Sequence, residues 1–384
     1  MTTTGLNGAE GVFVGRVWLP QTGPALVALR DGAIVDITSQ AVPTMRDLLE
    51  LDDPAAHVAA QDGRALAPLA ELEAESLAAG ADPERRHLLA PNDLQAVKAA
   101  GVTFAKSMVE RVIEERAAGD PQAARAIRDS IGKLIGTSLS DITPGSEQAQ
   151  RVKAALIGEG LWSQYLEVGI GPDAEIFSKA QVLSAVGWGA PVGLHPMSVW
   201  NNPEPEVVLA VNSRGQIRGA CIGNDVNLRD VEGRSALLLS KAKDNNASAA
   251  LGPFIRLFDA GFTLDDVRAA ELEMTVTGPD GFTLTGRSLM SEISRDPADL
   301  VAQTLNESHQ YPDGFMLYLG TLFAPTEDRD VPGEGFTHKI GDRVEISASG
   351  LGTLVNTVRH SGDCAPWTFG AAALMRNLAG RGLL

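Results

Sequence analysis

Short runs of apolar and β-branched residues, joined by turns rich in glycine, recur along most of this sequence. Residues 207–211 and 216–222 flank an Asn-Ser-Arg-Gly turn, and residues 272–276 and 282–285 flank a Gly-Pro-Asp-Gly turn. Two such runs joined by a tight turn are typical of an antiparallel hairpin. The 40 glycines and 21 prolines are also more turn-forming residues than a bundle of helices would carry. The pattern therefore predicts an α+β fold with a large, mostly antiparallel β region.

The first part of the chain has its own strands and helices. Residues 11–37 have a strand pattern in which Asp31-Gly32, a strong hairpin signal, separates two runs. Thr44 and Asp47 then form a capping-box-like start to a helical stretch rich in Ala, Leu and Glu. We predict a small N-terminal α+β domain over residues 1–85 and a larger catalytic domain over residues 86–384.

Helical patterns also interrupt the larger domain. Apolar residues at helical spacing predict helices over residues 107–116 and 123–136. Two further helices are expected over residues 247–258 and 297–309, between the β-rich stretches.

Charge and cysteine content exclude several classes of protein. The 49 acidic residues outnumber the 32 Lys and Arg, and the resulting net charge of −17 argues against binding to nucleic acid or an anionic membrane. Two cysteines, Cys221 and Cys364, cannot build a disulfide-rich scaffold or a Cys-ligated zinc site. The sequence has no basic start followed by an apolar stretch and no apolar run that approaches a membrane span. We therefore expect a soluble, cytoplasmic protein.

Several common catalytic motifs are missing from the sequence. It contains no GxxxxGK[ST] phosphate loop, no HExxH and no GxSxG. The six histidines are scattered, and none lies at metal-ligand spacing from another. The sequence therefore disfavours hydrolysis of nucleoside triphosphates, zinc peptidase chemistry and α/β-hydrolase chemistry.

One acidic pair is chemically informative. Glu204 and Glu206 directly precede an apolar run, and residues i and i+2 of a strand project from the same face. Two neighbouring carboxylates that are partly buried repel each other unless a cation or a proton neutralises them. Oxygen ligands favour Mg²⁺, Mn²⁺ or Ca²⁺ over zinc. The alternative is an exposed acidic turn whose side chains are solvated.

A second acidic cluster strengthens the metal interpretation. Asp225 follows the run that pairs with the first cluster, so hairpin geometry can bring it close to both glutamates. Lys241 and Lys243 come next, and a lysine near a metal and an anionic substrate can act as a charge partner or as a base. The alternatives are a turn-capping role for Asp225, a local ion pair between Arg229 and Asp230, and a solvated lysine loop.

These motifs together resemble those of the fumarylacetoacetate hydrolase family. The resemblance covers roughly residues 90–384 and implies a fumarylacetoacetate hydrolase-like mixed β-sandwich roll. Its motifs occur in family order: Glu204 and Glu206, then Asn224-Asp225 with Arg229-Asp230, Lys243 with Gly252-Pro253, Gly320-Thr321, and Gly341-Asp342 with Gly350-Leu351-Gly352 and Asn356. Each motif alone is weak, whereas five of them in order are specific.

One departure from the family pattern bears on the reaction. The family's hydrolases carry a His–Glu dyad that activates water, and here Ser107 stands at the position of the histidine while Glu110 retains the glutamate. A serine cannot act as a general base near neutral pH without an activating partner. The departure argues against hydrolysis of a C–C bond.

The chain is similar to the branch of the family that dehydrates 2-keto-3-deoxy sugar acids. This resemblance implies an Mg²⁺-dependent conversion of 2-keto-3-deoxy-D-pentonate to 2,5-dioxopentanoate in a homodimer or homotetramer. It implies metal ligation by Glu204, Glu206 and Asp225, catalysis by Glu175, Lys243, Glu110 and Ser107, and substrate binding by Arg229, Asp244, Gly320 and Thr321.

The reaction needs at least two groups that transfer protons. We assign them to Glu175 and Lys243, and the sequence does not say which is the base and which is the acid. Two rival activities use the same kind of site: a hydrolase that cleaves a C–C bond of an acylpyruvate or diketo acid, and an oxaloacetate-type decarboxylase. A sugar-acid-binding protein without catalytic activity is a rival of another class.

Overall fold

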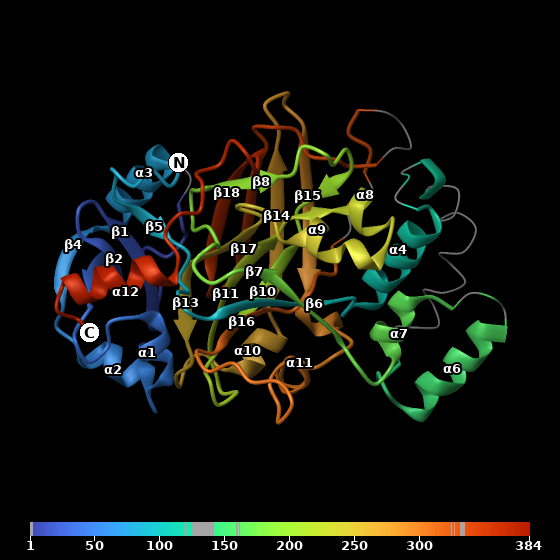
Figure 1. Ribbon diagram of the computed structural model, residues 1–384, viewed down its shortest axis with the longest axis horizontal. Coiled ribbons are helices and arrows are strands. Elements are labelled where there is room, and N and C mark those ends of the chain that lie inside the picture. Colours follow the sequence, from blue (N-terminus) through green and yellow to red (C-terminus); the bar gives the residue numbers. More distant parts are fainter. Residues whose placement is uncertain are drawn as a thin grey trace.

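A long mixed sheet runs through the centre of the protein (Figure 1). The computed structural model describes residues 3–118, 120, 122–124, 142–158, 160, 162–323, 325, 327–330 and 335–384. The strand order of the long sheet is β4-β3-β2-β1-β13-β11-β10-β16-β6-β7, and β5 pairs with β1. Its strands are β1 (Phe13–Leu19), β2 (Gly23–Arg30), β3 (Ala33–Asp36), β4 (Arg64–Pro68), β5 (His87–Leu89), β6 (Ala96–Gly101), β7 (Glu175–Ala180), β10 (Pro205–Val211), β11 (Ile217–Asp225), β13 (Ala249–Leu257) and β16 (Phe315–Tyr318).

A second sheet of five strands packs against one face of the long sheet, in the order β15-β14-β17-β18-β8. Its strands are β8 (Pro191–Leu194), β14 (Glu271–Thr277), β15 (Thr283–Leu289), β17 (Arg343–Ala348) and β18 (Gly352–His360), and β9 (Asn201–Asn202) pairs separately with β12 (Asn227–Leu228). Most pairs are antiparallel, whereas β6 with β16 and β8 with β18 are parallel. The predicted α+β, sandwich-like architecture is confirmed.

Alternation along β10 explains how the long sheet is buried on both faces. Val207, Leu209 and Val211 belong to the core shared with the five-stranded sheet. Val208 and Ala210 point to the opposite face and join a second core, to which helix α1 (Met45–Glu50) contributes. Because both faces are covered, polar side chains along this strand are buried wherever they occur.

The helices surround the sheets. They are α2 (Pro54–Ala60), α3 (Leu69–Ala79), α4 (Ala105–Arg116), α6 (Glu147–Gly158), α7 (Gln164–Ile170), α8 (Arg229–Glu232), α9 (Leu239–Lys243), α10 (Leu264–Arg268), α11 (Pro297–Thr304) and α12 (Ala371–Gly380), with short 3₁₀ turns at Ala236–Leu238 and Met290–Glu292. Helices α4 and α7 pack together around a third core that includes Trp200. None of the helices in the described part of the chain has the length and apolar composition needed to cross a bilayer.

The N-terminal strands and helix follow the sequence prediction closely. Strands β2 and β3 meet at Asp31-Gly32, and the Thr44 hydroxyl accepts a hydrogen bond from the backbone N–H of Asp47 at the start of α1. Strand β1 pairs with β13, so the N-terminal strands continue the central sheet. Helix α12 at the other end of the chain lies against these N-terminal strands (Figure 1). The division of the chain at residue 85 stays a prediction.

One predicted helix is wrong. Residues 249–257 form strand β13, which lies between β1 and β11 in the long sheet. The segment lacks the apolar–polar alternation of a half-exposed strand because almost all of its side chains are buried. Helix α4 confirms the prediction for residues 107–116. Helix α11 is shorter than the helix predicted over residues 297–309. Most of the helix predicted at 123–136 lies outside the described residues.

The close packing around β11 generates a test of the fold. A Cβ atom at Gly223 would lie 2.3 Å from a ring carbon of Tyr318 and 2.5 Å from a methyl of Val208. We expect Gly223→Ala to lower the free energy of unfolding by about 1–3 kcal/mol, measured by urea denaturation, because overpacking forces neighbours to move. Gly362→Ala is the matched control, since no atom lies within 4 Å of its added Cβ. Equal stability of the two variants would contradict this packing.

Candidate active site

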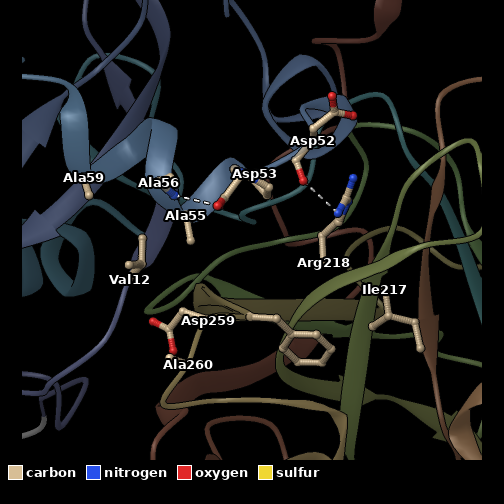
Figure 2. A pocket seen from close by; sticks show the side chains of 12 residues that line it. Val12, Asp52, Asp53, Ala55, Ala56, Ala59, Ile217, Arg218, Asp259 and Ala260 are labelled. Carbon is tan, nitrogen blue, oxygen red and sulfur yellow. Dashed lines mark hydrogen bonds between the residues drawn. The ribbon is translucent and has the colours of Figure 1, made fainter.

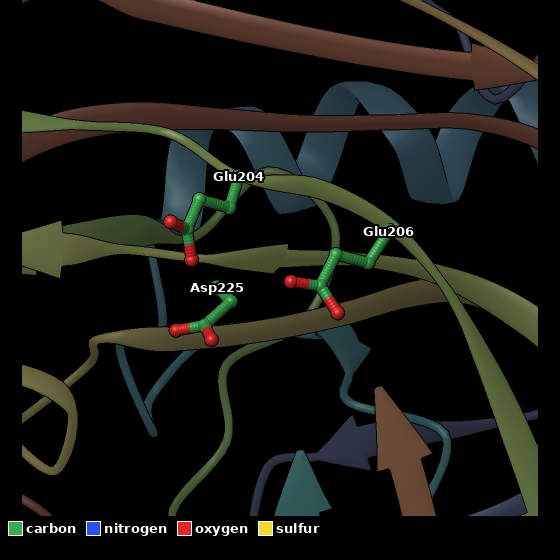
Figure 3. Close-up of side chains that lie close together, drawn as sticks. All are labelled: Glu204, Glu206 and Asp225. Carbon is green, nitrogen blue, oxygen red and sulfur yellow. The ribbon is translucent and has the colours of Figure 1, made fainter. Parts of the chain in front are cut away.

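Three carboxylates meet where the hairpin of β10 and β11 ends. Glu206 lies in β10, Glu204 directly precedes it and Asp225 is the last residue of β11. The backbone N–H of Asp225 donates to the Glu204 carbonyl over 3.0 Å, which fixes the hairpin at this point. All three side chains are buried, and one oxygen from each lies within 4.8 Å of the others (Figure 3). The hairpin therefore brings together the three residues that the sequence pattern selected as metal ligands.

Two lysines neutralise part of this negative charge. Lys243 Nζ donates to Glu204 Oε2 over 2.5 Å and to Asp225 Oδ2 over 3.0 Å. Lys179 Nζ lies 2.7 Å from Asp225 Oδ1 and donates to the backbone carbonyls of Val226 and Lys243. Burial alone would raise the pKa of Asp225, but the two ammonium groups hold it below its usual range. Asp225 and Glu204 in turn raise the pKa of Lys243 against the effect of burial, so Lys243 stays protonated.

Glu206 has a different environment. Its Oε2 accepts a hydrogen bond of 2.7 Å from the backbone N–H of Gly320. Burial, together with the charges of Asp225 and Glu204, raises the pKa of Glu206 well above its usual range. The ion pairs of the cluster in the described part of the chain go to Glu204 and Asp225, so a hard divalent cation bound by the three carboxylates could replace the proton on Glu206.

Gly320 is placed by its backbone conformation. Its φ of +88° lies in the left-handed region, and a Cβ would lie 2.0 Å from Thr103 Oγ1. Only glycine can therefore turn the chain here and present its N–H to Glu206. Thr321 follows with its side chain largely buried.

A small cavity of about 30 Å³ lies over these groups. The predicted site residues that line it are Glu175, Glu204, Glu206, Asp225, Lys243, Gly320 and Thr321, and the other lining residues are Ala100, Gly101, Val102, Arg111, Phe177 and Glu232. Lys241 is exposed, as expected for one of the two lysines. The cavity thus combines a carboxylate cluster, a protonated lysine and a further acid in one small space.

Glu175 opens strand β7 beside the end of β6. It pairs with Gly101, and a Cβ at Gly101 would lie 2.0 Å from Glu175 Oε2, so glycine makes room for the carboxyl group. Burial, with a further contribution from the charge of Glu232, raises the pKa of Glu175 to about 7. A carboxyl group with this pKa can both accept and release a proton near neutral pH.

Three predicted residues do not line the cavity. The Arg229 guanidinium lies 4.1 Å from the Trp200 ring centroid and donates to the Pro325 carbonyl. Glu110 Oε2 lies 3.7 Å from Arg229 NH2. Asp244 accepts a hydrogen bond from the Gln181 side chain. The side chain of Ser107 lies outside the described residues, although its backbone belongs to α4.

Sequence reasoning missed four residues at or beside the cavity, which are Arg111, Phe177, Lys179 and Glu232. Their spacing from predicted residues could have found most of them. Glu175, Phe177 and Lys179 occupy alternate positions of β7 and therefore share one face. Arg111 lies four positions after Ser107 in α4, on the same side of the helix. Glu232 closes α8, the helix that starts with Arg229.

A larger cavity, of about 480 Å³, lies elsewhere, between α2 and the ends of β11 and β13 (Figure 2). Its charged groups support the fold. Asp53 accepts from the backbone N–H of Ala56 at the start of α2, and Arg218 donates to the carbonyls of Leu51 and Asp52. The smaller cavity, with its buried carboxylates, is therefore the candidate active site.

Part of the chain matches one family model, and two curated proteins are similar to it. Residues 198–359 match the family described as fumarylacetoacetate hydrolase C-terminal. "Probable 2-keto-3-deoxyxylonate dehydratase" of Haloferax volcanii is 28% identical over 213 residues, which are 56% of this chain and 68% of that protein. 2-Dehydro-3-deoxy-D-arabinonate dehydratase of Saccharolobus solfataricus is 31% identical over 187 residues, 48% of this chain and 58% of that protein.

Solved structures share the fold. A 2-keto-3-deoxy-D-arabinonate dehydratase in its apo form superimposes with a TM-score of 0.64 at 19% identity, covering 91% of this chain and 99% of that chain. The same enzyme name is given to a complex with magnesium and 2,5-dioxopentanoate, which has a TM-score of 0.62 at 20% identity and covers 91% and 99% of the two chains.

The buried lysine on β7 yields a prediction for the site. Lys179→Met removes one of the two ammonium groups on Asp225, and breaking a buried ion pair typically costs about 3–5 kcal/mol of folding free energy. We expect a lower melting temperature without metal and a larger stabilisation by added Mg²⁺, both measured by thermal unfolding, because the cation takes over charge that Lys179 supplied. Lys98→Met is the control, because the Lys98 ammonium bonds the Ser178 hydroxyl and lies away from the carboxylates. A Lys179→Met protein as stable and as Mg²⁺-responsive as the control would contradict this role.

Proposed function

We propose that this chain, which carries a fumarylacetoacetate hydrolase C-terminal domain, is an Mg²⁺-dependent dehydratase that converts 2-keto-3-deoxy-D-pentonate to 2,5-dioxopentanoate. The observation that carries the proposal is the cavity in which the buried Glu204, Glu206 and Asp225 lie together with Lys243 and Glu175. The names of the two relatives support the substrate class.

Glu204, Glu206 and Asp225 would hold the metal through their carboxylate oxygens. Mg²⁺, which Mn²⁺ or Ca²⁺ could replace, acts when bound as a Lewis acid that polarises the substrate ketone and acidifies the protons at C3. The chain's own groups then have to move protons and bind the substrate carboxylate.

Glu175 is the base in this proposal. Its pKa of about 7 lets a substantial fraction of the carboxyl groups ionise at neutral pH, whereas Lys243 is held protonated by Asp225 and Glu204. Glu175 would take a proton from C3 and give it to the C4 hydroxyl, which would leave as water, and a proton shift from C5 would complete the aldehyde. Lys243 would supply positive charge beside the reacting oxygens.

The turn at Gly320 and Thr321 is the proposed site for the substrate carboxylate, because both residues line the cavity. Arg229 and Asp244, which the family resemblance also implicates, would act from outside it. The stacking of Arg229 on Trp200 and its proximity to Glu110 support a role in holding α8 against α4.

A coupled assay tests the function directly. We expect the wild-type protein with Mg²⁺ to convert 2-keto-3-deoxy-D-pentonate to an aldehyde that an added aldehyde dehydrogenase reports, and EDTA to stop the reaction. Glu204→Gln should reduce the rate by at least about a hundredfold, since it removes one metal carboxylate. Glu271→Gln, an exposed residue on β14, is the matched control and should leave the rate unchanged. Pyruvate released from an acylpyruvate or from oxaloacetate, without aldehyde from the pentonate, would replace the dehydratase by one of its rivals.

The pH dependence tests the role of Glu175. If Glu175 is the base, kcat/KM rises with pH, about tenfold per unit, until its carboxyl group ionises, and is then level. The limb should lie at or below pH 7, because a bound cation stabilises the ionised form. Glu175→Gln should remove this limb and most of the activity. A kcat/KM that falls with pH through the same range would make Glu175 the acid.

A further inference from the structure

Two ion pairs clamp helix α4 to helix α8. The consecutive residues Glu110 and Arg111 of α4 face Arg229 and Glu232, which lie one turn apart in α8. Arg229 lies 3.7 Å from Glu110, and Arg111 NH1 lies 2.9 Å from Glu232 Oε2. The two pairs have opposite polarity, so each helix contributes one acid and one base.

The two pairs differ in what they face. Arg229 and Glu110 lie outside the cavity lining, whereas Arg111 and Glu232 both line the cavity. Glu232 is only 4% exposed, and burying an ion pair of this kind usually gives little or no net stability over apolar side chains. A buried charged pair on the wall of a small cavity is therefore better explained by what the cavity binds than by folding.

Arg111 also contacts one of the three carboxylates that would bind the metal. Its NH2 lies 2.6 Å from Glu204 Oε1, while Lys243 holds the other oxygen of the same carboxylate. Glu204 thus separates Lys243 and Asp225 on one side from Arg111 and Glu232 on the other. Glu175 lines the same cavity as this pair.

A 2-keto-3-deoxy sugar acid has two chemically different ends. Its carboxylate and ketone oxygens are metal ligands, and its hydroxyl groups lie on the carbons beyond. With the first end at the carboxylate cluster, the hydroxyl groups would be within the part of the cavity that Arg111 and Glu232 also line. A hydroxyl group both donates and accepts, and this pair offers a carboxylate that accepts beside a guanidinium that donates.

We infer that Arg111 and Glu232 are specificity-determining residues that bind the hydroxyl groups of the substrate. The inference rests on the proposed function for the class of substrate. Arg111 and Glu232 hold each other in place before the substrate arrives. A ligand that lacks hydroxyl groups therefore gains no binding free energy from this pair.

The experiment compares two ligands on the full-length, Mg²⁺-loaded protein. 2-Keto-3-deoxy-D-pentonate carries both ends, whereas oxalate resembles only the metal-binding end and has no hydroxyl group. Glu232→Gln keeps the shape of the side chain, and Arg111→Lys keeps a positive charge beside Glu204 but loses the forked guanidinium. We expect either variant to lower kcat/KM for the pentonate by about ten- to a hundredfold, mainly through KM, with the inhibition constant of oxalate within about threefold of wild type.

Three results would overturn the inference. If the inhibition constant of oxalate rises by the same factor, Arg111 and Glu232 only support Glu204. If kcat/KM for the pentonate stays within threefold of wild type, the pair has no role in binding the substrate. If only kcat falls, the pair acts on Glu175 alone. Thermal unfolding with and without Mg²⁺ shows that each variant is folded and binds metal, and Glu271→Gln is again the control. A wild-type protein that forms no aldehyde from the pentonate, in contrast, would refute the proposed function itself.

Discussion

Carboxylates that lie together in a protein interior need positive charge, and much of this structure supplies it. Glu204, Glu206 and Asp225 are each less than 5% exposed, and their mutual repulsion would be costly without partners. Lys179 from β7, Lys243 from α9 and Arg111 from α4 each reach one or two of them. The cluster therefore joins elements that are far apart in sequence, and the geometry of the site depends on all of them being in place.

Much of the central hairpin and its chemistry could be predicted from the sequence. Alternation along β10 put Glu204 and Glu206 on one face, and the turn after Val211 set the partner strand on which Asp225 lies. These are local rules, since a hairpin is defined by its own turn and by the pattern of its own side chains. Gly320 was selected through the family resemblance, and the structure adds the reason for a glycine, which is its left-handed backbone.

The errors have a common physical cause, which is dependence on distant partners. Residues 249–257 read as a helix because their strand, β13, is buried on both faces by strands and helices from elsewhere in the chain. The role of Arg229 in substrate binding stays a prediction, and its guanidinium contacts Trp200, Pro325 and Glu110 outside the cavity lining. Spacing places Lys179 on the face of Glu175 and Arg111 on the side of Ser107, but only the tertiary structure shows which carboxylates their charges meet.

The pairing of β1 with β13 has a consequence for the life of the chain before it is folded. Phe13 lies opposite Arg256, and Asn377 in the last helix donates to the Thr22 carbonyl in the first hairpin. On the ribosome, β1 emerges long before β13, and the helix that bonds the turn of its hairpin arrives last. Residues 16–18 of β1 can pair early with β5, whereas Phe13 and Val14 must wait for β13, and an unpaired strand edge is open to misassociation. The order in which the strands are synthesised therefore differs from their order in the sheet.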